Sequence, residues 1–113
     1  MKTISIWMTY DLGVGGDYQG MYSWLDDHEA DECGNNAAFV KFQHPENLET
    51  DEEFTESLAK DLNQKIKLVP SNRIYIVWAS FDKGDIMGRF IYGKRKANPW
   101  KGFGSKADNT IDG

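Results

Sequence analysis

The chain has 113 residues and a formal net charge of −5, with 40% hydrophobic and 13% aromatic residues. This size and apolar content favour one folded domain and exclude both a disordered chain and two separate cores. No apolar run approaches the roughly 18 residues of a membrane helix, and no secretory signal pattern precedes the first expected strand. We therefore expect no membrane association and a cytoplasmic protein, in agreement with a single cysteine, Cys33, that cannot form an internal disulfide.

The charge is divided unevenly along the chain. Residues 1–70 contain 5 basic and 14 acidic residues, whereas residues 71–113 contain 8 basic and 4 acidic residues. Binding to a nucleic-acid backbone needs several positive contacts on one surface. Only the C-terminal third is therefore expected to supply such a surface.

The clearest element is a strand over residues 3–10, where apolar and other side chains alternate with a period of two. Its expected core face consists of Ile4, Ile6, Met8 and Tyr10. Asp11 ends this strand and is followed by Gly13, Gly15 and Gly16. Such a segment can hold a metal ion, a phosphate group or a tight turn.

Residues 18–27 are predicted to form a helix capped by Asp17, whose carboxylate can accept hydrogen bonds from the first-turn N–H groups. The spacing i, i+3, i+4, i+7 defines the expected core face, which consists of Tyr18, Met21, Tyr22 and Leu25. Trp24 lies off this face. We expect it to contact a loop or a partner.

A hairpin and a second helix are expected next. Residues 29–33 and 37–42 favour strands on either side of Gly34-Asn35-Asn36, whose residues tolerate the positive φ of a turn. Thr50 begins a capping box, which predicts a helix over residues 51–66.

The last two expected strands are residues 73–80 and 86–92. The order β-α-β-β-α-β-β is that of a ferredoxin-like split βαβ unit with one extra strand. It is an α+β fold with an antiparallel sheet and two helices on one face. We expect a single domain over residues 1–92 and a basic, aromatic and partly flexible tail over residues 93–113.

Strand parity places a second set of apolar side chains on the sheet face opposite the helices. These residues are Trp7, Phe39, Tyr75, Val77 and Ala79. A patch of this kind is unfavourable in water. We expect it to be covered by a second copy of the chain, by the tail or by another partner.

The residues at the strand ends suggest a family. Tyr10-Asp11-Leu12, Asp17-Tyr18, Ala38-Phe39-Val40 and the late strand pair, within residues 3–92, resemble the small CRISPR-associated ferredoxin-like subunit of the spacer-adaptation complex and its stand-alone relatives. The resemblance implies a homodimer whose sheets face one another, with the last strand extending the partner's sheet. Some members are described as metal-dependent nucleases that use the aspartate ending the first strand, and others as non-catalytic scaffolds.

Carried over to this chain, the nuclease aspartate is Asp11. Two such carboxylates at a dimer axis could share Mg²⁺, which could activate a water molecule for phosphodiester attack. The alternative is a turn carboxylate that accepts backbone N–H groups ahead of Gly13. The chain also departs from the family, because residues 17–32 contain no basic residue.

The tail interleaves cations and aromatic rings, a composition that binds phosphates and stacks bases. The candidate contact residues for nucleic acid or another partner are Lys94, Arg95, Lys96, Trp100 and Lys101. The alternative is a tail docked on its own domain or on a dimer mate through Trp100.

The acidic half of the chain has a separate interpretation. Asp26, Asp27, Glu52 and Glu53 lie in or next to the two predicted helices and could bind a basic protein, as acidic inhibitors and immunity proteins do. His28 in this region is a candidate base or metal ligand, with a solvated helix end as the alternative. The leading hypothesis is a homodimeric binding or scaffold module with nucleic acid as a candidate partner, and both the acidic inhibitor and the nuclease stay open.

Overall fold

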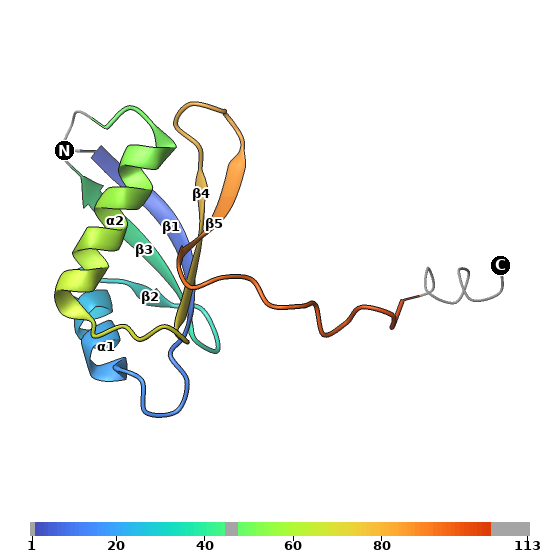
Figure 1. Cartoon of the computed structure of the whole chain (residues 1–113). Helices are drawn as coiled ribbons and strands as arrows, with labels where there is room; N and C mark the ends of the chain where they lie inside the picture. Colours follow the sequence, from blue (N-terminus) through green and yellow to red (C-terminus); the bar gives the residue numbers. More distant parts are fainter. Residues whose placement is uncertain (1, 45–47, 105–113) are drawn as a thin grey trace, which may run out of the picture.

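The computed structural model describes residues 2–44 and 48–104. Its elements are β1 (Lys2–Asp11), α1 (Tyr18–Asp27), β2 (Asp31–Glu32), β3 (Ala37–His44), α2 (Asp51–Lys65), β4 (Arg73–Ala79) and β5 (Ile86–Tyr92) (Figure 1). The strands form one five-stranded antiparallel sheet in the order β2-β3-β1-β4-β5. The predicted α+β class with two helices is confirmed. The sheet is compatible with a ferredoxin-like fold, but its strand order and its number of strands differ from those of the split βαβ layout.

The core lies between the sheet and the helices. β1 is the central strand and pairs with β3 on one side and β4 on the other. Its alternate residues are buried, because successive side chains point to opposite faces and the helices cover only one of them. α1 contributes Met21 and Trp24 to this core, and α2 contributes Phe54, Leu58 and Leu62. Both helices therefore cover the same face of the sheet (Figure 1).

The predicted core face of α1 is confirmed at Met21, and Tyr18 and Leu25 pack against the core, but the face is wrong at Tyr22 and leaves out Trp24. Trp24 is 2% exposed, whereas Tyr22 is 55% exposed. The indole N–H of Trp24 donates to the Asp61 carboxylate at 2.7 Å. This bond ties α1 to α2 and turns the Trp24 side of the helix inward.

The strand predicted over residues 29–33 shrinks to the two residues of β2. The segment that follows α1 is used to end the helix: Glu29 has a φ of 52°, and the N–H of Ala30 donates to the Leu25 carbonyl at 2.9 Å. Glu29 and Ala30 are therefore not available to pair with β3 in the sheet. The expected turn at Gly34 and Asn36 is present, with positive φ at both residues.

Asp17 caps α1 as predicted and also connects it to the chain that follows α2. One carboxylate oxygen accepts the Gly20 N–H at 3.0 Å, and the other accepts the Lys67 N–H at 2.8 Å. These two backbone hydrogen bonds, first that from Lys67, lower the pKa of Asp17. Because this carboxylate already fills the helix N-terminus, the preceding glycines act here as a turn, with positive φ at Gly13 and Gly15.

Replacing Gly20 with alanine should lower the free energy of unfolding. Helix propensity alone would raise it by roughly 1 kcal/mol. A Cβ at Gly20 would, however, overlap the Asp17 carboxylate and come within 2.8 Å of the Lys65 carbonyl oxygen. Urea denaturation of Gly20→Ala checks the sign, with the exposed neighbour Gln19→Ala as the control that follows propensity. A higher urea midpoint for Gly20→Ala would show that the Asp17 cap is not held in this geometry.

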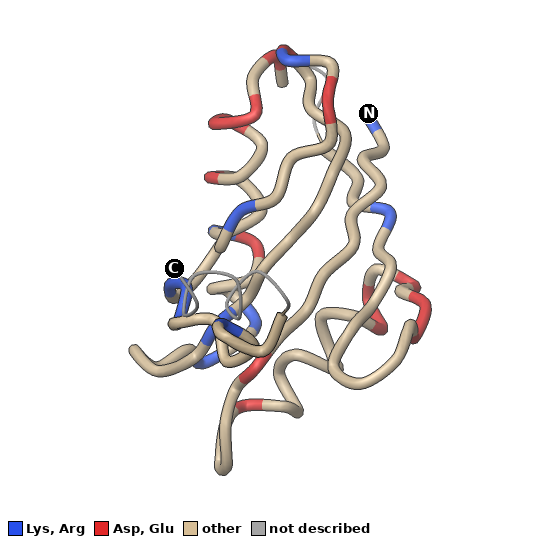
Figure 2. The backbone as a smooth tube through the Cα atoms, turned by 90° about the vertical axis from the view of Figure 1, so that its right-hand side faces the viewer, with Lys and Arg blue, Asp and Glu red and all other residues tan. Residues whose placement is uncertain are grey.

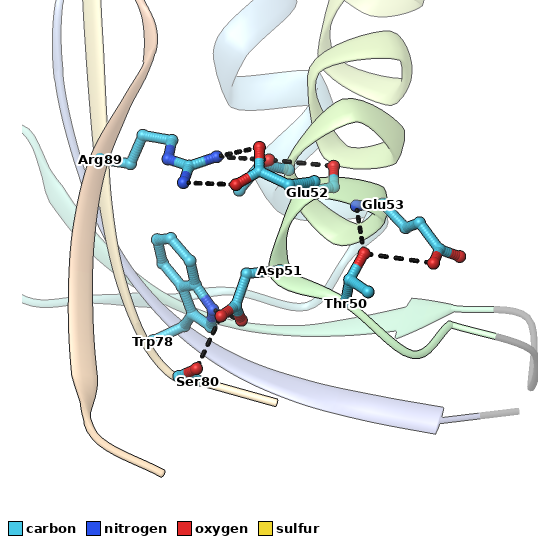
Figure 3. A network of polar contacts seen from close by, with 8 residues as sticks. Thr50, Asp51, Glu52, Glu53, Trp78, Ser80 and Arg89 are labelled. Atoms are coloured by element: carbon cyan, nitrogen blue, oxygen red, sulfur yellow. Dashed lines mark hydrogen bonds and ion pairs between the residues drawn. The ribbon is translucent and has the colours of Figure 1, made fainter. Parts of the chain in front are cut away.

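Asp51 connects the start of α2 to the end of β4 (Figure 3). Its buried carboxylate accepts hydrogen bonds from Trp78 Nε1 at 2.8 Å, Ser80 Oγ at 2.6 Å and the Phe81 N–H at 3.0 Å. Burial by itself raises the pKa of Asp51, but the hydrogen bonds outweigh it and hold that pKa well below its ordinary value. The buried carboxylate is therefore charged in the folded protein at neutral pH.

Candidate nucleic-acid interface

The sheet face opposite the helices, here called the open face, carries a row of aromatic side chains. Trp7 is 55% exposed, and its ring centroid lies 4.9 Å from that of Phe39. On the neighbouring strands, the Tyr75 and Phe90 centroids lie 4.8 Å apart at a steep angle. The open face therefore presents two ring pairs.

Strand register determines this arrangement. Trp7 pairs with Phe39 on β3 and with Val77 on β4, so the three side chains share a face, as parity predicted. The regular register of β4 and β5 places Phe90 opposite Tyr75, and the register shift comes only after this pair, where Ile74 lies opposite Tyr92. The role of Trp7, Phe39, Tyr75 and Val77 as a dimer face stays a prediction.

Two guanidinium groups surround the second ring pair. Arg95, from the tail, lies 5.7 Å from the Tyr75 centroid and 5.5 Å from the Phe90 centroid. Arg73 lies 5.7 Å from the Phe90 centroid. These distances are those of cation–π contacts. The two rings therefore keep the positively charged guanidinium groups of Arg73 and Arg95 at this end of the sheet.

A hollow of about 480 Å³ opens beside these groups, with Asp11, Asn36, Arg73, Tyr75, Phe90 and Arg95 among the residues around it. A second hollow of about 410 Å³ runs along the tail toward Trp100. Arg73, Phe90 and Arg95 line both hollows. The two hollows therefore adjoin one another at these three residues, between the open face and the tail.

The tail runs away from the sheet after β5 (Figure 1). Trp100 is 68% exposed and is not buried against its own domain, so within residues 93–104 it is Arg95 that packs on the sheet. Lys94, Lys96 and Lys101 are exposed. Figure 2 shows basic residues gathered where the tail leaves the sheet. The part of the predicted flexible tail over residues 105–113 lies outside the described residues.

Asp11 sits at the edge of the first hollow. One of its oxygens accepts the Gly13 N–H at 3.1 Å, which is the turn role considered above. The other lies 3.9 Å from Arg73 Nη2. No group of three or more His, Cys, Asp or Glu residues in the described part of the chain could hold a metal ion. A Mg²⁺ site at Asp11 stays a prediction that requires a second copy.

The predicted acidic surface is partly engaged within the molecule. Asp27 pairs with Lys65 at 3.0 Å. Glu52 forms a bidentate pair with Arg89 at 2.9 and 3.0 Å, and this pairing lowers the pKa of Glu52 (Figure 3). Asp26 and Glu53 are exposed. Binding of a basic protein through these four residues stays a prediction.

His28 is part of the packing between the helices. Its ring stacks on Trp24 with centroids 4.1 Å apart, and its Nδ1 lies 2.8 Å from the Trp24 carbonyl oxygen. Its Nε2 lies 3.4 Å from Asp61. The ring is thus held by α1 and α2, which does not resemble the solvated helix end expected for it.

Sequence reasoning missed three members of the open-face site: Asn36, Arg73 and Phe90. Arg73 directly precedes the alternating residues of β4, and parity with Tyr75 could have found it. Phe90 could have been found by extending the pairing of β4 with β5 from their hairpin, because the register is regular from Ala79–Ile86 to Tyr75–Phe90.

No helix within residues 2–44 and 48–104 has the length and apolar character needed to cross a membrane. Comparison of the chain with protein-family models, curated proteins and solved structures found no match, and the resemblance to the CRISPR-associated subunit stays a prediction.

Proposed function

We propose that this protein is a non-catalytic module that binds single-stranded nucleic acid on the open face of a ferredoxin-like sheet and along its tail. The observation that carries the proposal is the row of two ring pairs, in which Trp7 is exposed and the other three rings are half-buried, with Arg73 and Arg95 packed on the second pair. Rings on a sheet surface can stack on unpaired bases, and guanidiniums can contact both bases and phosphates. This role is similar to that of the scaffold members of the CRISPR-associated family that the chain resembles. We expect the protein to act in the cytoplasm.

Single strands suit this surface better than a duplex. Bases in a duplex are stacked on each other and cannot reach a flat aromatic row. The ring pairs lie two strand spacings apart across the sheet and two residues apart along it, because Trp7 pairs with Val77 and Thr9 with Tyr75. Their centres are therefore about 12 Å apart at the usual strand dimensions. This leaves room for separate bases on the two pairs. The net charge of −5 also disfavours the extensive phosphate contacts that bulk duplex binding needs.

A second copy of the chain is the competing occupant of the open face. In a two-fold dimer the same patch meets itself. Arg73 and Arg95 of both copies would then enter one interface, which favours an anionic occupant over another copy. The homodimer expected from the family resemblance is nevertheless testable, because light scattering of the protein alone gives its mass.

Fluorescence anisotropy with labelled oligonucleotides tests the proposal. We expect a single-stranded oligonucleotide of about 12 nucleotides to bind more tightly than the matched duplex at equal salt. Equal or tighter binding of the duplex, or no binding of either, would exclude the proposal. Cleavage of the oligonucleotide with Mg²⁺ would instead favour the nuclease, and Asp11→Asn would then be the variant to assay.

Lys94 and Lys96 in the tail should contribute to the salt dependence of the affinity for single-stranded nucleic acid. The double variant Lys94→Ala/Lys96→Ala removes two exposed cations. We expect the slope of log affinity against log salt to become shallower by about 1.4, because each phosphate contact on a single strand contributes about 0.7. The matched control is Lys60→Ala/Lys67→Ala, which removes the same charge from exposed positions on α2 and just after it. If both variants change the slope equally, the tail is not a specific contact.

A further inference from the structure

We propose that the hollow at the Asp11 end of the open face is a pocket for a guanine base, an inference that rests on the nucleic-acid function proposed above. Its volume of about 480 Å³ lies in the range of roughly 300–1,000 Å³ that is usual for small-molecule sites. The residues around it supply ring faces, guanidiniums, side-chain amides and one carboxylate. These are the groups that stack on a base and read its edge.

The Asp11 carboxylate has hydrogen-bonding capacity for a ligand. One oxygen accepts the Gly13 N–H at 3.1 Å. The other lies 3.9 Å from Arg73 Nη2, which is longer than a hydrogen bond. A carboxylate has about four lone-pair positions, and this side chain is 54% exposed. Asp11 can therefore accept two further hydrogen bonds from donors that lie side by side.

Arg73 supplies donors next to this acceptor. Its Nε is buried and, within the described part of the chain, has no hydrogen-bond partner. A buried donor without an acceptor is unfavourable, so the guanidinium gains from a ligand that brings acceptor atoms and lets it reorient. The site thus offers a carboxylate and a guanidinium in one hollow.

Guanine matches this pair better than the other bases do. Its N1–H and N2–H groups are adjacent and suit the two oxygens of a carboxylate, and its O6 and N7 atoms suit an arginine fork. Adenine, cytosine and uracil do not present two adjacent donor atoms. Tyr75, Phe90 and the Arg95 guanidinium provide the flat surfaces on which the base can stack.

Titration of the full chain with free mononucleotides, followed by protein NMR, tests the pocket. We expect GMP to bind about tenfold more tightly than AMP, CMP or UMP, since a good bidentate pair discriminates bases at this level or above. Inosine monophosphate, which lacks the N2 amino group, should bind more weakly than GMP. The shifted signals should include those of Asp11, Arg73 and Tyr75.

Asp11→Asn turns one acceptor into a donor while its remaining oxygen can still accept the Gly13 N–H. This variant should lose the preference for GMP. Asp31→Asn is the matched control, because Asp31 pairs with Phe39 on the same sheet and lies outside the hollow. Equal affinity for the four mononucleotides, or an unchanged GMP preference in Asp11→Asn, would overturn the guanine pocket.

Oligonucleotides separate this result from the broader proposal. One outcome is that oligouridine binds, that Trp7→Ala weakens this binding, and that the mononucleotides show no preference for GMP. This outcome would exclude the guanine pocket and would still support the nucleic-acid function. GMP binding without binding of any oligonucleotide would leave the pocket as a site for a free nucleotide and would remove the proposed function.

Discussion

Replacing Asp51 with alanine is expected to lower the free energy of unfolding by about 2–4 kcal/mol. The variant leaves the Trp78 indole N–H, the Ser80 hydroxyl and the Phe81 N–H without their acceptor. Trp78 is 1% exposed, so water cannot replace the lost partner without disturbing the core. Chemical denaturation measured by circular dichroism gives the difference.

Glu56→Ala is the matched control for Asp51→Ala. Glu56 lies on the same helix and is exposed. Its removal should change stability by no more than about 0.5 kcal/mol. Similar losses for the two variants would mean that the carboxylate network between α2 and β4 does not contribute as described.

The pH dependence of stability follows from the same carboxylate. The folded-state pKa of Asp51 is lower than its ordinary value of 3.8, so the charged form stabilises the fold above that pH. This contribution is lost progressively as the pH falls below 3.8 toward the folded-state pKa. Asp51→Asn keeps an acceptor but cannot titrate. The stability difference between wild type and Asp51→Asn should therefore shrink on acidification, whereas a constant difference would exclude the charge as its source.

The second large effect is expected on the affinity for single-stranded nucleic acid when Trp7 is replaced. Trp7→Ala is expected to weaken binding of single-stranded nucleic acid by about 5- to 150-fold, because one stacked base contributes about 1–3 kcal/mol. The fold should tolerate the change, since Trp7 is 55% exposed and lies on the open face. Anisotropy titrations of both proteins at one salt concentration measure the ratio.

Two further variants make the Trp7 result specific. Tyr22 on α1 has the same exposed fraction, 55%, and Tyr22→Ala should leave the affinity within about twofold. Trp7→Phe retains a ring and should recover part of the affinity. If Trp7→Ala binds normally but changes the mass of the protein in light scattering, the open face is a dimer interface and the proposed function is wrong.

Much of the fold follows from local patterns along the chain. The alternation in β1 and the capping box at Thr50 are strong signals, and both elements are present. The α1 face and β2 were predicted poorly, for physical reasons. Two overlapping faces of α1 fit the helical period, because Met21, Trp24, Leu25 and His28 have the same i, i+3, i+4, i+7 spacing as the predicted set. The hydrogen bond from Trp24 to Asp61, 37 residues away, belongs to the face that is buried, and the sequence spacing does not choose between the two.

The site was only partly predictable. Parity identifies Trp7, Phe39 and Tyr75, because a side-chain period of two needs no tertiary information. Parity within one strand does not identify Phe90, because its place opposite Tyr75 also requires the register of the hairpin between β4 and β5. Asp51 illustrates the same limit. Its position at a helix start predicts an exposed first-turn acid, whereas the fold buries it under the end of β4.

The four tryptophans offer the most direct test of binding on the open face. In an NMR titration with a single-stranded oligonucleotide, each indole N–H gives one signal. We expect the signals of Trp7 and Trp100 to move, because both side chains are exposed along the proposed binding surface. The signals of Trp24 and Trp78 should stay in place, because both side chains are buried in the core between the helices and the sheet. Stationary signals for Trp7 and Trp100 at saturating oligonucleotide, or shifts confined to α1 and α2, would contradict binding on the open face.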